Sequence, residues 1–139
     1  MIDIPADFDD WSAGKVQSRK LRRILVCGGR DFDDFEVVYV ALAPFIRSGV
    51  TTIIHGGARG ADDLAGQFAA LWSLAVEVYP ADWDTHGRAA GPIRNKQMLE
   101  EGKPDLVIAF PGGKGTANMI GQAKEAGIPV REIEAKVGA

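Results

Sequence analysis

The stretch DLVIAFPGGKGT, residues 105–116, runs from a continuous apolar segment into a turn with three glycines and then toward a helix. Apolar runs rich in branched side chains are typical of strands buried on both faces, and such strands occur in parallel sheets that helices cover on both sides. Glycine suits the end of such a strand because its backbone turns without a steric penalty. The stretch therefore predicts one strand–turn–helix unit of an α/β fold.

The same unit recurs along the rest of the chain. Alternating strands and helices favour right-handed βαβ connections and a parallel sheet. We therefore expect a three-layer, Rossmann-like domain with about five parallel strands, helices on both faces and the first strand at the centre. The strands are expected at 23–29, 51–57, 76–82, 105–110 and 128–134, and the helices at 34–49, 60–75, 92–103 and 115–127.

Two of these helices carry further expectations. The segment at 34–49 is apolar on more than one face, which permits a partner surface. In the helix at 60–75, one buried face is expected from the spacing of four apolar residues, namely Leu64, Phe68, Leu71 and Trp72.

Composition bounds the class of protein. The chain has 139 residues, enough for one domain with a single core, and a net charge of −3, which gives no overall basic field for nucleic acid. No apolar run reaches the roughly 20 residues of a membrane span. The only cysteine, Cys27, excludes an internal disulfide and fits a reducing, cytoplasmic setting. Two scattered histidines and the absence of zinc-ligand spacing predict no metal, and no cofactor is expected.

The first 20 residues differ from the rest of the chain. They are polar and acidic, and they lead into the basic segment RKLRR at 19–23. We interpret 1–20 as a peripheral arm and 21–139 as a single nucleotide-binding domain.

Three strands end in glycine-rich turns. The carboxyl ends of parallel strands lie along one edge, where ligands bind at the point of reversed winding, so these turns are expected to line one crevice. A single glycine pair would indicate only a tight turn, whereas three at one edge favour a site. The expected ligand-binding residues in these turns are Gly28, Gly29, Arg30, Gly56, Gly57, Arg59, Gly60, Pro111, Gly112, Gly113, Gly115 and Thr116.

The expected ligand chemistry follows from the properties of helix N-termini. The first turn of a helix has unpaired N–H groups and a partial positive charge, and glycine lets an anion approach them closely. Thr116 is placed to cap its helix or to donate its hydroxyl to a phosphate oxygen. The pattern matches neither the dinucleotide motif GxGxxG nor the P-loop GxxxxGK[ST]. The turns therefore predict a phosphate-sized hollow of another kind.

Charged residues in the turns have alternative roles. Arg59 suits bidentate phosphate binding or a surface ion pair. Asp62 is expected in the first turn of a helix. Its carboxylate is either stabilised there by the helix dipole or used in catalysis. Asp31 suits a turn or a catalytic role. His55 is interpreted as structural.

Residues 81–98 are expected to form a polar loop that folds over the crevice edge and runs into the third helix. Arg88 and Arg94 are its candidate cations. Asn95 could hydrogen-bond a ribose or base, and Trp83 could either stack on a base or belong to the core.

Four segments in order carry a resemblance to a known family: GGRDFDD at 28–34, IHGGARGADDLA at 54–65, PADWDTHGRAAGPIRNKQML at 80–99 and DLVIAFPGGKGTA at 105–117. Together they resemble the SLOG superfamily, in particular its YspA- and cpYpsA-related branch, over about residues 22–134. The best-known members are the LOG phosphoribohydrolases, formerly labelled lysine decarboxylase-like. The resemblance implies a Rossmann-like fold, usually dimeric, that binds a nucleoside monophosphate and cleaves its N-glycosidic bond.

The match is incomplete at one position. The LOG signature PGGxGTxxE places its phosphate loop at Gly112, Gly113, Gly115 and Thr116. Arg94 matches the arginine of a second LOG segment, R-K-x-x-M, with Met98 in place and Asn95 directly after the arginine. The catalytic glutamate of PGGxGTxxE, however, corresponds here to Met119. A thioether cannot stabilise the positive charge that develops on the sugar.

Two functions from different classes follow. In the first, the domain binds or senses a nucleotide or nucleotide-derived ligand without cleaving it. In the alternative, a phosphoribohydrolase-like enzyme uses Asp31, Asp62 or Asp82 with Arg94 as catalytic residues. A DNA-processing single-strand binder is a third hypothesis, but net negative charge and the lack of a basic aromatic stripe disfavour nucleic acid. The expected partners are a nucleotide-like small molecule and a second copy in a homodimer, with no membrane association.

Overall fold

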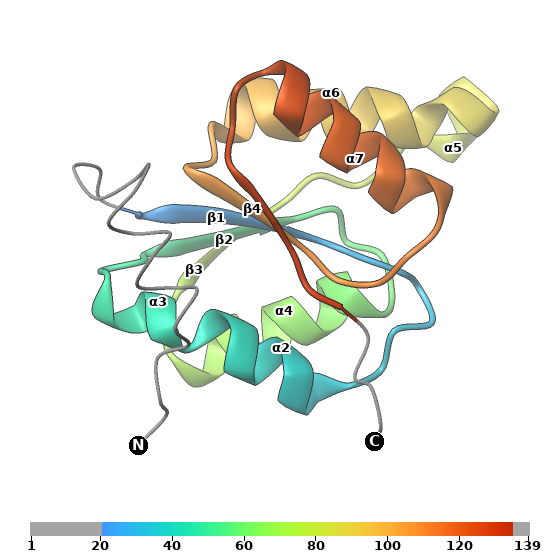
Figure 1. The fold of residues 1–139 in the computed structure, drawn as a ribbon. Helices are drawn as coiled ribbons and strands as arrows, with labels where there is room; N and C mark the ends of the chain where they lie inside the picture. Colours follow the sequence, from blue (N-terminus) through green and yellow to red (C-terminus); the bar gives the residue numbers. More distant parts are fainter. Residues whose placement is uncertain (1–20, 135–139) are drawn as a thin grey trace.

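The computed structural model describes residues 21–134, so the arm predicted at 1–20 lies outside the described residues. Five parallel strands form one sheet in the order β3-β2-β1-β4-β5 (Figure 1). The first strand is central, as the sequence predicts. The strands are β1 (Arg23–Cys27), β2 (Thr52–His55), β3 (Ala75–Val78), β4 (Leu106–Ala109) and β5 (Val130–Glu132).

Helices cover both faces of this sheet, which confirms the three-layer α/β architecture (Figure 1). One face is covered by α2 (Phe35–Leu42), α3 (Pro44–Arg47) and α4 (Ala61–Leu71). The other face is covered by α5 (Trp83–His86), the 3₁₀ helix η1 (Gly87–Ala89), α6 (Ala90–Gly102) and α7 (Lys114–Glu125).

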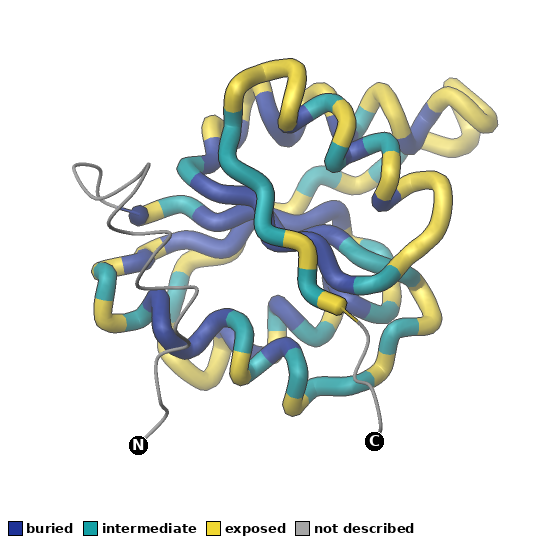
Figure 2. Tube along the Cα trace, viewed as in Figure 1, coloured by how far each residue is buried: buried dark blue, intermediate teal, exposed yellow. Residues whose placement is uncertain are grey.

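The three central strands are buried along their length because helices pack on both of their faces (Figure 2). Successive side chains of β1 point to opposite faces, so Ile24 packs with the α2–α4 layer and Leu25 with the α6–α7 layer. Leu25 pairs with Ile54 of β2 and with Val107 of β4. Burial of each such side chain contributes about 1.5–3 kcal/mol relative to leaving it in water.

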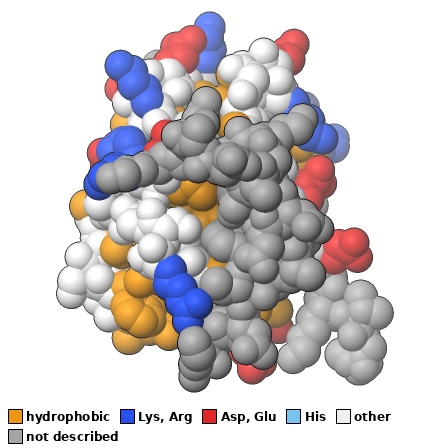
Figure 3. Space-filling view, turned by 60° about the vertical axis from the view of Figure 1, so that its left-hand side comes forward, with side chains coloured by type: hydrophobic (Ala, Val, Ile, Leu, Met, Phe, Trp, Pro, Cys, Tyr) orange, Lys and Arg blue, Asp and Glu red, His pale blue; other side chains and the backbone are white. Residues whose placement is uncertain are grey.

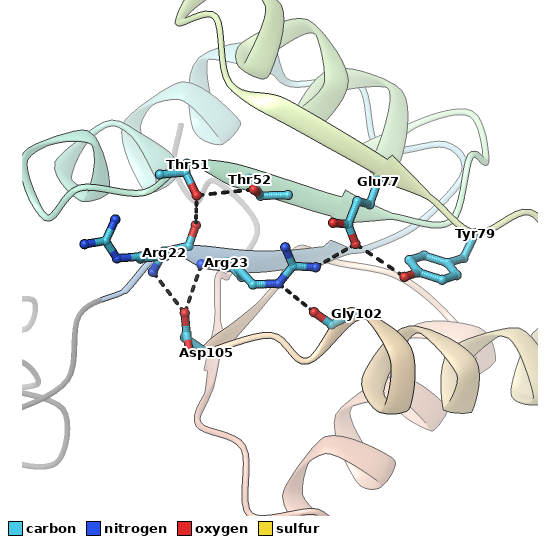
Figure 4. A network of polar contacts seen from close by, with 8 residues as sticks. All are labelled: Arg22, Arg23, Thr51, Thr52, Glu77, Tyr79, Gly102 and Asp105. Atoms are coloured by element: carbon cyan, nitrogen blue, oxygen red, sulfur yellow. Dashed lines mark hydrogen bonds and ion pairs between the residues drawn. The ribbon is translucent and has the colours of Figure 1, made fainter.

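A polar network that starts from Arg23, at the beginning of β1, links the edge strand β3 to the central strand (Figure 4). The Arg23 guanidinium lies 2.6 Å from the Glu77 carboxylate and also donates to the carbonyl of Gly102 over 2.7 Å. The Tyr79 hydroxyl donates to the same carboxylate over 3.3 Å. The hydrogen bond from Arg23 is the main cause that lowers the pKa of Glu77. The network therefore connects β1, β3 and the end of α6.

The helix expected at 34–49 is interrupted. Pro44 has no N–H to continue the hydrogen-bond ladder, so α2 ends at Leu42 and Pro44 occupies the first turn of the short α3. Val38 and Leu42 are buried, whereas Val40 is exposed.

The buried face expected for the 60–75 helix is only partly correct. Phe68 is fully buried, but Leu71 and Trp72 are exposed because they lie at the end of α4, past the sheet. The face that meets the sheet is formed largely by small residues, which let the helix approach closely; it consists of Ala61, Asp62, Ala65, Phe68 and Ala69.

The expected polar loop at 81–98 is mostly helical. Asp82 caps α5 by accepting from the N–H of Thr85 over 3.1 Å, and α6 already begins at Ala90. Consecutive short helices therefore position the residues that precede α6, and α5 is exposed throughout (Figure 2).

Within residues 21–134, no helix combines the length and apolarity needed to cross a bilayer. Basic and acidic side chains are interspersed on the face that Figure 3 shows, in the part not covered in grey.

Candidate functional site

Gly29 connects the three glycine-rich turns. Its N–H donates to the carbonyl of Pro111 over 2.8 Å, and its own carbonyl accepts from the N–H of Ala61 at the start of α4 over 3.1 Å. The turns that follow β1, β2 and β4 therefore meet at the carboxyl edge of the sheet. The winding of the chain reverses there, since β2 and β3 extend from one side of β1 and β4 and β5 from the other.

Several of the glycines are required by this packing. A Cβ at Gly60, whose φ is +81°, would collide with the carbonyl oxygen of Gly29. A Cβ at Gly112 would meet the hydroxyl of Thr116, and one at Gly56 would meet the guanidinium of Arg94. The space on the Cβ side of these glycines is filled by the protein itself, so their lack of a side chain is required by the close packing of one turn against another.

Other glycines at the same edge face open space. A Cβ at Gly113 or Gly115 would have no neighbour within 4 Å. Gly113 is the N-cap of α7 and Gly115 lies in its first turn, where N–H groups have no carbonyl partner within the helix. Thr116 does not cap this helix, contrary to one prediction. The N-cap position is occupied by Gly113, which has no side chain that could accept a hydrogen bond. The start of α7 is therefore open to an anion.

A cavity of about 340 Å³ lies directly in front of this helix start. Its volume is in the range of small-molecule sites. It combines the start of α7 with the turn after β1 and with residues of α6. Its lining consists of Val26, Cys27, Gly28, Gly29, Arg30, Ala58, Asp62, Trp83, Gly91, Arg94, Asn95, Met98, Gly113, Gly115 and Thr116.

Arg94 is held rigidly in the wall of this cavity. Its Nη1 donates to the carbonyl oxygens of Gly56, over 2.9 Å, and Tyr79, over 3.3 Å. Its Nε donates to the side-chain oxygen of Asn95 over 3.1 Å. Burial lowers the pKa of Arg94, and the negative charge of Asp62 opposes that shift. The guanidinium remains a cation at neutral pH because the pKa of arginine starts far above neutrality.

Asn95 joins α6 to the start of α7. Its amide nitrogen donates to the carbonyl of Gly115 over 3.3 Å and to the side chain of Asn118 over 3.1 Å. Its oxygen accepts from Arg94. Asn95 therefore positions Arg94 and the α7 start, and it also lines the cavity, so its contact with a ribose or base stays a prediction.

Asp62 holds the turn after β2. Its Oδ2 accepts from the N–H groups of Gly56, over 3.0 Å, and Ala58, over 3.2 Å. Burial raises the pKa of Asp62, and these hydrogen bonds oppose the rise. Next to it, His55 accepts from the N–H of Gly57 through Nδ1 over 3.0 Å, and burial lowers the pKa of this imidazole. His55 is thus structural, in agreement with its interpretation from the sequence.

The other candidate carboxylates lie outside the cavity. Asp31 and Arg59 form an ion pair of 3.2 Å in which both side chains are largely exposed. Asp82 caps α5 at the surface. Of the described residues that line the cavity, Asp62 is the only carboxylate. The structure therefore does not place Asp31 beside Arg94, as catalysis by that pair would require.

Met119, at the position of the LOG glutamate, is fully buried in the core cluster that also contains Leu25 and Met98. It does not line the cavity. Arg88 lies on the exposed η1 and does not line this cavity.

Five lining residues escaped the sequence analysis as site candidates, namely Val26, Cys27, Ala58, Gly91 and Met98. Cys27 lies at the inner wall, and burial raises the pKa of its thiol to about 12, so it stays protonated at neutral pH. Met98 lines the same wall from α6. The only feature of the sequence that indicates Cys27 as a site residue is its position at the end of β1, directly before Gly28.

Trp83 and Arg30 stand together at the cavity wall. The Arg30 guanidinium lies 5.3 Å from the centre of the Trp83 ring, within the range of a cation–π interaction. Trp83 is 47% exposed, so it is not the core residue that one interpretation of the sequence suggests.

Fold and site together define a Rossmann-like α/β domain with a ligand-sized cavity at the carboxyl edge of its sheet. The chain belongs to the YspA- and cpYpsA-related SLOG family, whose model matches residues 22–86. The Gene 61 protein of Mycobacterium phage D29 is 39% identical, and the alignment covers 79% of this chain and 94% of that protein.

Two crystal structures of the C-terminal domain of PF1911 hydrogenase from Pyrococcus furiosus are also similar in fold. They align with TM-scores of 0.48 and 0.46 at 19% and 18% identity. The alignments cover 82% and 85% of this chain and 92% and 95% of those chains.

Proposed function

We propose that this protein binds a nucleotide or nucleotide-derived ligand, with a phosphate group at the start of α7. The observation that carries the proposal is the open first turn of α7, which faces the cavity that Arg94 also lines. Unpaired N–H groups, the helix dipole and a fixed guanidinium all favour an anion at one place.

Arg94 suits this task because it is already desolvated and positioned. Its Nη1 and Nε bind protein oxygens, and no protein acceptor within the described residues is bonded to Nη2. A phosphate oxygen would provide that acceptor. Because the side chain is held in place beforehand, binding loses little conformational entropy.

Isothermal titration calorimetry with AMP, GMP, CMP and UMP tests the proposal directly. We expect saturable binding of one nucleoside monophosphate per chain, weakened by inorganic phosphate as a competitor. Absence of binding at millimolar nucleotide, with a folded protein, would contradict it.

A second function, cleavage of the N-glycosidic bond, is favoured by the position of Asp62. Its carboxylate is the only one among the described lining residues, and a carboxylate can stabilise the positive charge that develops on the sugar. Water would be consumed, and the free base and ribose 5-phosphate would be released. Chromatography of the incubated nucleotide for free base distinguishes this enzyme from a binding or sensing domain.

We also propose a homodimer, on the strength of the family resemblance, and a cytoplasmic location, because the single cysteine fits a reducing compartment. Size-exclusion chromatography with light scattering tests the oligomeric state.

A further inference from the structure

A second cavity, of about 390 Å³, adjoins the first. The two share four lining residues, so one ligand could extend from one cavity into the other. The shared residues are Arg30, Ala58, Trp83 and Arg94. The remaining wall of the second cavity comes from the turn after β2 and the segment before α5, through Gly56, Gly57, Arg59, Pro80 and Ala81.

The lining of the second cavity favours a negatively charged ligand. It is lined by three arginines, Arg30, Arg59 and Arg94, and none of its described lining residues is acidic. Arg59 pairs with Asp31, but both side chains are largely exposed, at 74% and 94%. Such exposed pairs contribute little stability, so the Arg59 guanidinium can turn to an incoming anion at small cost.

An aromatic surface lies between the two anion-favouring regions. Trp83 lines both cavities, and its exposed ring is covered on one side by the guanidinium of Arg30. A nucleobase can stack on an indole ring, and base–aromatic stacking is sequence-tolerant. Trp83 thus borders both the cavity at the start of α7 and the cavity that Arg59 lines.

We propose that the ligand is a nucleoside with two phosphate groups on separate positions of its ribose, as in a nucleoside 3′,5′-bisphosphate. The inference rests on the proposed function, since the 5′-phosphate occupies the start of α7. The base stacks on Trp83, and the second phosphate enters the second cavity, where Arg59 binds it.

Two isomers provide a sharp test. Adenosine 5′-diphosphate and adenosine 3′,5′-bisphosphate have the same composition and differ only in where the second phosphate is attached. With calorimetry, we expect the 3′,5′-bisphosphate to bind at least about tenfold more tightly than AMP, because a second charge-assisted contact forms. The affinity of the 5′-diphosphate should exceed that of AMP by much less, because its second phosphate stays beside the first.

Three variants test whether Arg59 is responsible for the tighter binding of the bisphosphate relative to AMP. Arg59→Ala should abolish the gain of the bisphosphate and leave AMP binding within about twofold. Arg47→Ala, which removes an equally exposed charge from α3, should change neither affinity. Asp31→Asn should increase the gain, because Arg59 loses its partner.

The outcomes separate the two proposals. If AMP binds but the bisphosphate binds no more tightly than AMP, or if Arg59→Ala leaves the gain intact, the second phosphate site is refuted and the proposed function stands. An equal gain with the 5′-diphosphate refutes it in the same way. If none of the four nucleoside monophosphates binds and neither two-phosphate isomer binds, both proposals are wrong.

Discussion

The guanidinium of Arg94 donates to the carbonyl oxygen of Gly56 over 2.9 Å, although the two residues are 38 positions apart in the chain. The guanidinium occupies the space that a side chain at position 56 would need. Gly56 also donates its N–H to Asp62. One glycine therefore lies between the cation and the carboxylate of the cavity and holds both in place.

Substitution of Gly56 by alanine should disturb this arrangement. The added methyl group would collide with Arg94, and overpacking of this kind typically costs about 1–3 kcal/mol. We expect a lower urea midpoint and weaker nucleotide binding. As the control, Gly121→Ala in α7 meets open space and should stabilise the protein by up to about 1 kcal/mol. Equal stability of the Gly56→Ala and wild-type proteins would contradict the crowding.

Gly115→Glu should separate binding from folding. A Cβ at this position meets no neighbour within 4 Å, and an acidic residue in the first turn of α7 improves both helix propensity and the dipole interaction, by about 0.5–1 kcal/mol. The same carboxylate occupies the proposed phosphate position and repels an anion. Calorimetry should therefore show lost nucleotide binding in a protein that is at least as stable as the wild type.

Gly121→Glu is the matched control for that charge. It adds the same side chain at another open position of α7, outside the cavity. We expect unchanged nucleotide affinity. If both glutamate variants bind nucleotide as the wild type does, the start of α7 is not the phosphate site.

Two substitutions at Asp62 distinguish its structural role from a chemical one. A single oxygen, Oδ2, accepts both backbone N–H groups, so Asp62→Asn can keep these hydrogen bonds with its amide oxygen. Asp62→Ala leaves them unpaired, which costs about 1–3 kcal/mol. We expect only the alanine variant to lose stability in urea denaturation.

The same pair tests the enzyme hypothesis. If the domain hydrolyses nucleotides, free-base release should fall at least about 100-fold in Asp62→Asn while binding and stability persist. Unchanged release in that variant would exclude Asp62 from catalysis.

The Arg23–Glu77 pair predicts a pH dependence of stability. The pKa of Glu77 is lower in the folded protein than its ordinary value of 4.5, so the folded state favours the ionised form. Its contribution is complete above that ordinary value and is lost as the pH falls through the lower, folded value. The pair is partly exposed, at 29% and 39%, so we expect a contribution of about 0.2–1 kcal/mol.

Urea midpoints at pH 7 and pH 3 measure this contribution in the wild type and in Glu77→Gln. The variant should be less stable at pH 7 and should lose less stability on acidification. Glu100→Gln, which removes an exposed pair with Lys96 on α6, serves as the control and should match the wild type. A Glu77→Gln protein with the same acid sensitivity as the control would contradict the assignment.

Cys27 should be unreactive in the native protein. Its thiol is buried and has a pKa of about 12, so almost no thiolate exists at pH 8. Alkylation by iodoacetamide, followed by mass spectrometry, should be slow without denaturant and fast in urea. A bound nucleotide should slow it further, since Cys27 lines the proposed cavity.

Several features of the fold were predictable from local sequence. The apolar strands and their parallel arrangement follow from continuous hydrophobic runs that alternate with helical segments. The central position of β1 was expected from the fold class, since alternation alone does not determine the order of the strands. Errors arose where a local pattern met a non-local or stereochemical constraint. Pro44 divided a helix, and the sheet ended before Leu71 and Trp72.

Sequence by itself determined that three glycine-rich turns lie at one edge, because parallel strands share the direction of their carboxyl ends. Only the tertiary structure decided which glycines pack against the protein and which face open space. That distinction depends on atoms far away in the chain: Arg94 fills the space at Gly56, and nothing fills it at Gly115. The tertiary structure also decided that Asp62, and not Asp31, reaches the cavity. Only the packing of α4 against the sheet directs the side chain of Asp62 inward.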